Sequence, residues 1–163
     1  TVSGRELTQG ISAANGQLYS LGNFLSPAVD AFDTALLQGF TEHVAAVRRA
    51  GLEDLFRTPG VTAFVANDSL YAQDPGTLQN DPEPFLLHNV TRAPIPRLEE
   101  RVVPLEDGTQ ESILYVACDP EVGDRACSPW QFQDGTQIYP GSASFDGQSY
   151  LHQLRELHYP GGH

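Results

Sequence analysis

The sequence contains no methionine and no lysine, so all nine of its basic residues are arginines. P-loop sites and Schiff-base enzymes each require a lysine, and both kinds of site are therefore excluded from these 163 residues. No apolar run approaches the roughly 18 residues that a membrane-spanning helix requires. The Gly-x-Ser-x-Gly elbow of α/β-hydrolases is also missing, so Ser128 and Ser142, which lie in expected loops, gain no support as nucleophiles.

A secretory signal sequence is absent from the start of the chain, and we expect a processed mature protein or a fragment of a longer one. The length favours one domain with short tails. The formal net charge of −12 would repel a nucleic-acid backbone and an anionic membrane surface. We therefore expect neither nucleic acid nor direct membrane insertion. A basic protein partner or a cation remains open, as does a simple role of the charge in solubility.

The chain has two cysteines, Cys118 and Cys127, and the segment between them contains a proline and a glycine that allow it to turn back. This predicts a disulfide and hence an oxidising compartment, either extracellular, periplasmic or in an organelle lumen. Two free buried thiols are the alternative. The spacing is not that of a zinc-binding Cys-x-x-Cys pair. Asn67 and Asn89 begin formal Asn-x-Ser/Thr glycosylation triplets.

Residues 32–56 have the clearest helical pattern. Their apolar stripe at helical spacing consists of Leu36, Phe40, Val44 and Val47. Gly39 predicts a break in this pattern, and Thr41 is the expected cap of a second helix that stops at Gly51. A short helix follows, ending at Phe56.

Residues 61–66 are rich in β-branched side chains and predict a strand, after which Asn67 caps a short helix. Proline and glycine make 73–84 loop-like. The remaining expectations are a loose tail at 1–16, a compact apolar stretch at 84–90, an extended segment at 93–104, and strands at 17–25, 110–117, 130–139 and 149–158. Helices therefore precede a strand-rich half, which is typical of the α+β class.

The stretch from Phe40 to Tyr71 resembles the first sequence box of the fasciclin (FAS1) domain family. In that family an amphipathic helix ends in Ala-Gly-Leu, a short helix and a Thr-Val-Phe-Ala-type strand follow, and a polar pair precedes a small helix. The residues that match the strand and the polar pair are Thr62, Phe64, Asn67 and Asp68. His88 takes the histidine position of the family's Leu-x-Tyr-His segment, with a leucine in place of the tyrosine.

Residues 146–160 resemble the closing box of the family more weakly, and region 92–135 departs most from it. The resemblance implies a FAS1-like domain at 28–160, a tail at 161–163, and a β-sandwich or wedge with helices packed on one side. His88 would then be a core histidine held by hydrogen bonds. The start of the chain also resembles the closing box. Residues 1–27 are therefore expected to be either an N-terminal tail or the remnant of a preceding repeat.

The resemblance implies a non-enzymatic adhesion or protein-interaction module that binds another protein or a matrix component. One alternative is an accessory subunit of a membrane protein assembly on its lumenal or periplasmic side. Another is a carbohydrate-active enzyme that uses two carboxylates, and the adjacent acids that could supply them are Glu99–Glu100, Glu106–Asp107 and those of 119–124. Trp130 is the first choice for an interaction residue, with packing under the disulfide as its alternative.

We expect no catalytic residues, no cofactor and no metal. His43 is assigned to a helix face. His152 and His158 are expected to share one face of a strand, but no further ligands can be placed beside them.

Overall fold

The computed structural model describes residues 7–13, 16–21, 30–119, 121, 127–144 and 147–160. The expected C-terminal tail, parts of the expected N-terminal segment and the side chain of Ser142 lie outside the described residues. Within the described part of the chain, no helix is both long enough and apolar enough to cross a membrane.

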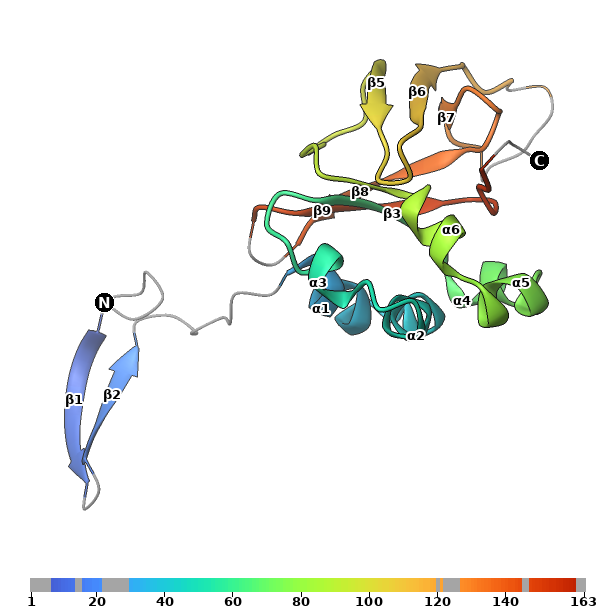
Figure 1. Ribbon diagram of the computed structural model, residues 1–163. Helices are drawn as coiled ribbons and strands as arrows, with labels where there is room; N and C mark the ends of the chain where they lie inside the picture. Colours follow the sequence, from blue (N-terminus) through green and yellow to red (C-terminus); the bar gives the residue numbers. More distant parts are fainter. Residues whose placement is uncertain are drawn as a thin grey trace.

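Two β-sheets and a set of short helices form the body of the molecule, which confirms the α+β class (Figure 1). The four-stranded sheet has the order β4-β3-β9-β8, and the three-stranded sheet has the order β5-β6-β7. In Figure 1 the helices lie on one side of the four-stranded sheet and the three-stranded sheet lies on the other. The strands of these sheets are β3 (Thr62–Val65), β4 (Val90–Thr91), β5 (Arg101–Pro104), β6 (Gln110–Tyr115), β7 (Trp130–Phe132), β8 (Ile138–Ala143) and β9 (Tyr150–Leu154).

Strand β3 is one of the two inner strands of the four-stranded sheet, and all four of its residues are buried. It pairs in parallel with β9 and antiparallel with β4. Since side chains alternate between the faces of a strand, Phe64 points towards the three-stranded sheet, where its ring meets that of Phe132 at 5.0 Å between centroids. A strand covered on both faces explains why 61–66 is almost continuously apolar.

Strands β8 and β9 pair antiparallel with an irregularity in register between Tyr139 and Ser142. Gly141 lies in this bulge, and a Cβ there would stand 1.6 Å from the carbonyl oxygen of Leu151. Only glycine allows so close an approach of the two backbones. The bulge also directs the amide of Gly141 to Nδ1 of His152 at 2.9 Å.

The helices before β3 follow the predicted order. They are α1 (Ala31–Leu37), α2 (Thr41–Arg49) and α3 (Glu53–Phe56). Gly51 has a φ of 71°, the left-handed conformation predicted for the residue after α2. Thr41 was the wrong cap, because Phe40 holds the N-cap position and makes no side-chain bond. Asp68 supplies the missing acceptor instead, since its Oδ1 accepts the amide of Glu42 at 2.9 Å.

The predicted apolar stripe is only partly correct. Val44 and Val47 are buried, but Leu36 is 44% exposed. The chain breaks between α1 and α2 at Gly39, whose φ is 87°. Because the second helix begins in a new direction, one helical period does not run through both helices.

Three further helices follow β3: α4 (Asp68–Tyr71), α5 (Pro75–Asn80) and α6 (Glu83–Leu87). Asn67 caps α4 as predicted, with its side chain accepting the amide of Leu70 at 2.9 Å. The prediction of a loop at 73–84 was wrong. Pro75 stands in the first turn of α5, where a missing amide costs nothing, and Asp74 caps the helix.

The first and last strands also differ from expectation. Residues expected to form a loose tail contain β1 (Leu7–Ala13), which pairs antiparallel with β2 (Gly16–Leu21), and Figure 1 shows this hairpin standing apart from the body. The strand expected at 130–139 is divided into β7 and β8 by a turn. The last strand ends at Leu154, so His158 lies beyond it rather than on the face that carries His152.

Replacement of Phe64 by alanine should lower the free energy of unfolding by about 3–5 kcal/mol, because it leaves a cavity between the two sheets. Phe64 is 1% exposed. Leu37→Ala, at a side chain that is 66% exposed, is the control and should change stability little. Urea unfolding at a fixed pH measures both. Equal stability of Phe64→Ala and the wild type would mean that β3 is not in the core.

Candidate functional site

The disulfide joins Cys118 to Cys127, whose Cα atoms lie 6.1 Å apart, as the sequence predicts. This geometry lies within the ordinary range for a disulfide. The bond closes a loop after β6, and the amide of Val116 donates to the carbonyl of Pro129 at 2.7 Å just before it. Such a bond suggests an oxidising environment.

A small apolar patch lies where β6 runs into the disulfide. We call Tyr115, Val116 and Trp130 the Tyr115 patch. Tyr115 is 55% exposed and Val116 is 46% exposed. The rings of Tyr115 and Trp130 meet edge to face at 5.3 Å between centroids. Trp130 itself is half-buried and packs against the core, so it supports the patch from below while Tyr115 forms its surface.

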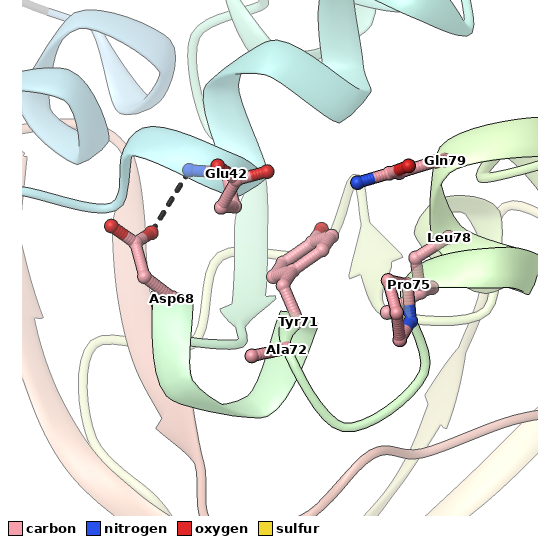
Figure 2. Close-up of a pocket in the computed structure, with 7 residues that line it drawn as sticks. All are labelled: Glu42, Asp68, Tyr71, Ala72, Pro75, Leu78 and Gln79. Carbon is pink, nitrogen blue, oxygen red and sulfur yellow. Dashed lines mark hydrogen bonds between the residues drawn. The ribbon is translucent and has the colours of Figure 1, made fainter.

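A pocket of about 340 Å³ lies among the helices on the other side of the four-stranded sheet. Figure 2 shows the ring of Tyr71 standing in it between Glu42 and Gln79. The other lining residues are Asp68, Ala72, Pro75 and Leu78. Carboxylate and amide oxygens at the rim suit a small cationic group, such as a basic side chain.

Tyr71 is 3% exposed, and among the described residues its hydroxyl has no hydrogen-bond partner. Burial raises the pKa of this phenol well above its ordinary value, so the hydroxyl stays protonated. It can therefore donate a hydrogen bond to a group that enters the pocket.

A third candidate is a polar cluster of two buried histidines and two partly exposed carboxylates, at the edge of the three-stranded sheet. His88, at the end of α6, and His158, beyond β9, lie with their ring centroids 4.5 Å apart. Glu111 reaches them from β6, and Asp134 from the turn between β7 and β8. Nε2 of His158 lies 3.4 Å from Oε2 of Glu111 and 3.4 Å from Oδ2 of Asp134.

Both histidines of this cluster have their Nδ1 atoms engaged. Nδ1 of His88 donates to Oδ2 of Asp107 at 2.6 Å. Nδ1 of His158 donates to Oδ1 of Asn89 at 2.8 Å. Burial raises the pKa of Glu111, and the charge of Asp134 raises it further. We refer to His88, Glu111, Asp134 and His158 as the histidine–carboxylate cluster.

Of the three candidates, the histidine–carboxylate cluster is the one that sequence patterns do not predict. Its four members come from four separate segments, and only the His88 position had been singled out as a core residue. His152 and His158, which were expected together, belong to different places. Nε2 of His152 donates to the carbonyl of Ile95 at 2.8 Å.

The residues that carry the fasciclin resemblance occupy structural positions. Thr62 and Phe64 are buried in β3, and Asn67 and Asp68 act as caps. Asn89, one of the formal glycosylation acceptors, is 2% exposed. Its side-chain nitrogen donates to the carbonyls of Phe85 and His158, each at 2.8 Å, so the folded chain leaves no room for a glycan there. Asn67 is half-buried, and its glycosylation stays a prediction.

Three of the acids considered for carbohydrate chemistry have separate partners, and Asp124 lies outside the described residues. Glu106 pairs with Arg92 at 3.1 Å. Asp107 is bound to His88, and Glu100 accepts the amide of Tyr115 at 3.4 Å. These contacts favour a structural use of the acids.

No family model matches the chain, and no curated protein shows significant sequence similarity to it.

The burial of His43 leads us to predict that the folded chain loses stability in acid. Its ring is buried against Phe56, and burial lowers its pKa from 6.5 to about 4. Between these values the unfolded chain binds the proton and the folded chain does not, so stability falls as the pH falls from 7 towards 4. The contribution lost at pH 5 is about 2 kcal/mol.

The measurement compares urea unfolding at pH 7 and pH 5 for the wild type and His43→Leu. The variant should lose about 2 kcal/mol less than the wild type over this interval. The same pH dependence in both proteins would show that His43 is not the group responsible.

The isolated hydroxyl of Tyr71 gives a second prediction. Tyr71→Phe should leave the free energy of unfolding within about 0.5 kcal/mol of the wild type, or raise it, because no protein hydrogen bond is lost. The matched control is Thr62→Val. The hydroxyl of Thr62 donates to the carbonyl of Ala93 and accepts the amide of Ile95, each at 2.8 Å. Its removal should cost about 1–3 kcal/mol. Similar losses in both variants would contradict the assignment.

Proposed function

We propose that the chain is a non-enzymatic, extracytoplasmic protein-interaction module of the fasciclin type. The observation that carries the proposal is the Tyr115 patch, an exposed aromatic and aliphatic surface on a fixed backbone beside a disulfide. The arrangement of helices, four-stranded sheet and three-stranded sheet suits the wedge that the resemblance implies. The disulfide supports an extracytoplasmic location.

The composition of the patch suits a binding surface. Tyrosine and tryptophan are enriched at the centres of protein interfaces, where they supply large contact areas with few rotatable bonds. Exposed apolar side chains that are grouped are typical of interaction sites, whereas those scattered singly are common on any protein surface. Tyr115 and Val116 are neighbours in the chain, and the ring of Trp130 contacts that of Tyr115.

The patch is held in one conformation by its neighbours. Strand β6 pairs with both β5 and β7, so Tyr115 lies opposite Trp130 in the register. The hydrogen bond from Val116 to Pro129 and the disulfide fix the chain that follows. A surface ordered before binding loses less conformational entropy when a partner docks, and this increases affinity.

Charges around the patch indicate the chemistry of the partner. Glu100 contacts the backbone of Tyr115, and Asp119 and Glu121 follow the disulfide's first cysteine; all three are exposed. The whole chain carries a net charge of −12. We therefore propose a protein partner that presents an apolar surface bordered by arginine or lysine side chains. Complementary charge of this kind speeds association and orients the partners.

The test is comparative capture of extracellular and matrix proteins by three forms of the chain. These are the wild type, the double variant Tyr115→Ser/Val116→Ser, and the control Leu37→Ser, which changes an exposed leucine on α1. A captured protein is then purified and its Kd measured for each form. The double variant should bind at least tenfold more weakly, a loss of about 1.4 kcal/mol, while the control binds like the wild type.

The remaining outcomes are also informative. Asp119→Asn/Glu121→Gln should slow association and weaken its dependence on salt. A partner found in fixed ratio with membrane proteins would identify the module as an accessory subunit. Equal binding by the wild type and the double variant, or no protein bound by any form, would overturn the proposal.

A further inference from the structure

The histidine–carboxylate cluster has a geometry that a set of direct hydrogen bonds does not explain. A charged N–H donor and a carboxylate oxygen normally lie about 2.7–2.9 Å apart. Nε2 of His158 lies instead at 3.4 Å from Oε2 of Glu111 and at the same distance from Oδ2 of Asp134. Two atoms that bind one tetrahedral zinc ion, with bonds of about 2.0–2.1 Å, are separated by about 3.3–3.4 Å. The observed spacing is that of ligands around a shared ion.

A third ligand is in reach from His88. One ligand atom each of His88, Glu111 and His158 lies within 4.8 Å of the others. Because Asp107 engages Nδ1 of His88, Nε2 is the nitrogen available to an ion.

Every member of the cluster has its outer atom fixed by a second partner. Asp107 holds Nδ1 of His88, and Asn89 holds Nδ1 of His158. Oε1 of Glu111 accepts the amide of Gln133 at 3.2 Å. Oδ1 of Asp134 accepts the amide of Thr136 at 2.9 Å.

This pattern is typical of metal sites. Metal-binding histidines donate their other ring N–H to a carboxylate or carbonyl, and this fixes both the tautomer and the ring orientation. In the cluster, each side chain has one atom bound to a partner outside the cluster. His88–Asp107 has the arrangement of a carboxylate–histidine–metal triad.

We propose that His88, Glu111 and His158 bind one zinc ion. Two imidazole nitrogens and a carboxylate oxygen suit a divalent transition metal better than calcium or magnesium, which prefer oxygen ligands alone. Oδ2 of Asp134, at 3.4 Å from Nε2 of His158, adds negative charge beside these ligands and so favours a cation there. The histidines are 4% and 0% exposed, whereas the side chains of Glu111 and Asp134 keep 14% and 17%, which leaves an entry route from the carboxylate side.

The ion would join parts of the chain that are remote in sequence. His88 belongs to the end of α6, Glu111 to the three-stranded sheet, and His158 to the segment beyond β9. Binding at this point ties that last segment to the second sheet. Zinc would therefore raise the melting temperature of the whole chain, since a ligand that binds only the folded state stabilises it.

The test uses the full chain without an affinity tag, treated with EDTA and then freed of it. Zinc chloride is titrated in by calorimetry at pH 7.5, and the cobalt(II) form is examined for the visible absorption of a tetrahedral site. The variants are Glu111→Gln, which keeps an acceptor for Gln133, and Asp107→Asn, which removes the negative charge beside His88 and keeps an oxygen for the amide of Thr109. Glu99→Gln removes an equal charge from the surface and is the control.

The wild type and Glu99→Gln should bind one zinc ion and show the cobalt absorption. Glu111→Gln should bind at least tenfold more weakly, and Asp107→Asn about 10–100-fold more weakly. X-ray absorption of the wild-type zinc complex should show two imidazole ligands, a result that does not depend on how any variant folds. Absence of saturable zinc binding, unchanged affinity in Glu111→Gln, or a zinc shell without two imidazoles would overturn the proposal.

Discussion

The edge-to-face contact between Phe64 and Phe132 is the interaction on which the layered structure depends. Phe64 comes from an inner strand of the four-stranded sheet, Phe132 ends the last strand of the other sheet, and both are buried. The ring of Phe132 also stacks on His158 at 4.2 Å between centroids with an angle of 9° between planes. One aromatic column therefore sets the spacing of the layers and holds His158 where Glu111 and Asp134 meet it.

The segment that connects the four-stranded sheet to the three-stranded sheet is held by side-chain hydrogen bonds rather than by strand pairing. Residues 92–100 form no strand, yet their backbone groups near Ile95 are buried and need partners. Thr62 satisfies both the carbonyl of Ala93 and the amide of Ile95, and His152 donates to the carbonyl of Ile95. The buried polar residues of β3 and β9 thus replace a missing strand, which explains why a threonine and a histidine occupy strands that are otherwise apolar.

Features that depend on neighbours in sequence could be predicted, and those that depend on distant segments could not. The strand at 61–66, the left-handed Gly51, the Asn67 cap and the disulfide follow from local composition and spacing. The cap of α2 could not be predicted because Asp68, which lies 26 residues from Glu42, supplies it. The histidine–carboxylate cluster was missed for the same reason. His158 looked like a strand residue, and nothing in the sequence relates it to Glu111 or to Asp134.

Positive charge is required between the two carboxylates of the histidine–carboxylate cluster. Glu111 and Asp134 direct two carboxylate oxygens at a nitrogen of one buried imidazole, and like charges so placed are stable only when positive charge lies between them. A proton on His158 supplies one unit of charge, and a divalent ion bound by two neutral histidines supplies two. Neutral histidines, however, leave the carboxylate of Asp107 without the charge of a protonated His88, so both arrangements give the same net charge. The 3.4 Å separations at Nε2 of His158, rather than the net charge, therefore favour an ion over a proton at this point.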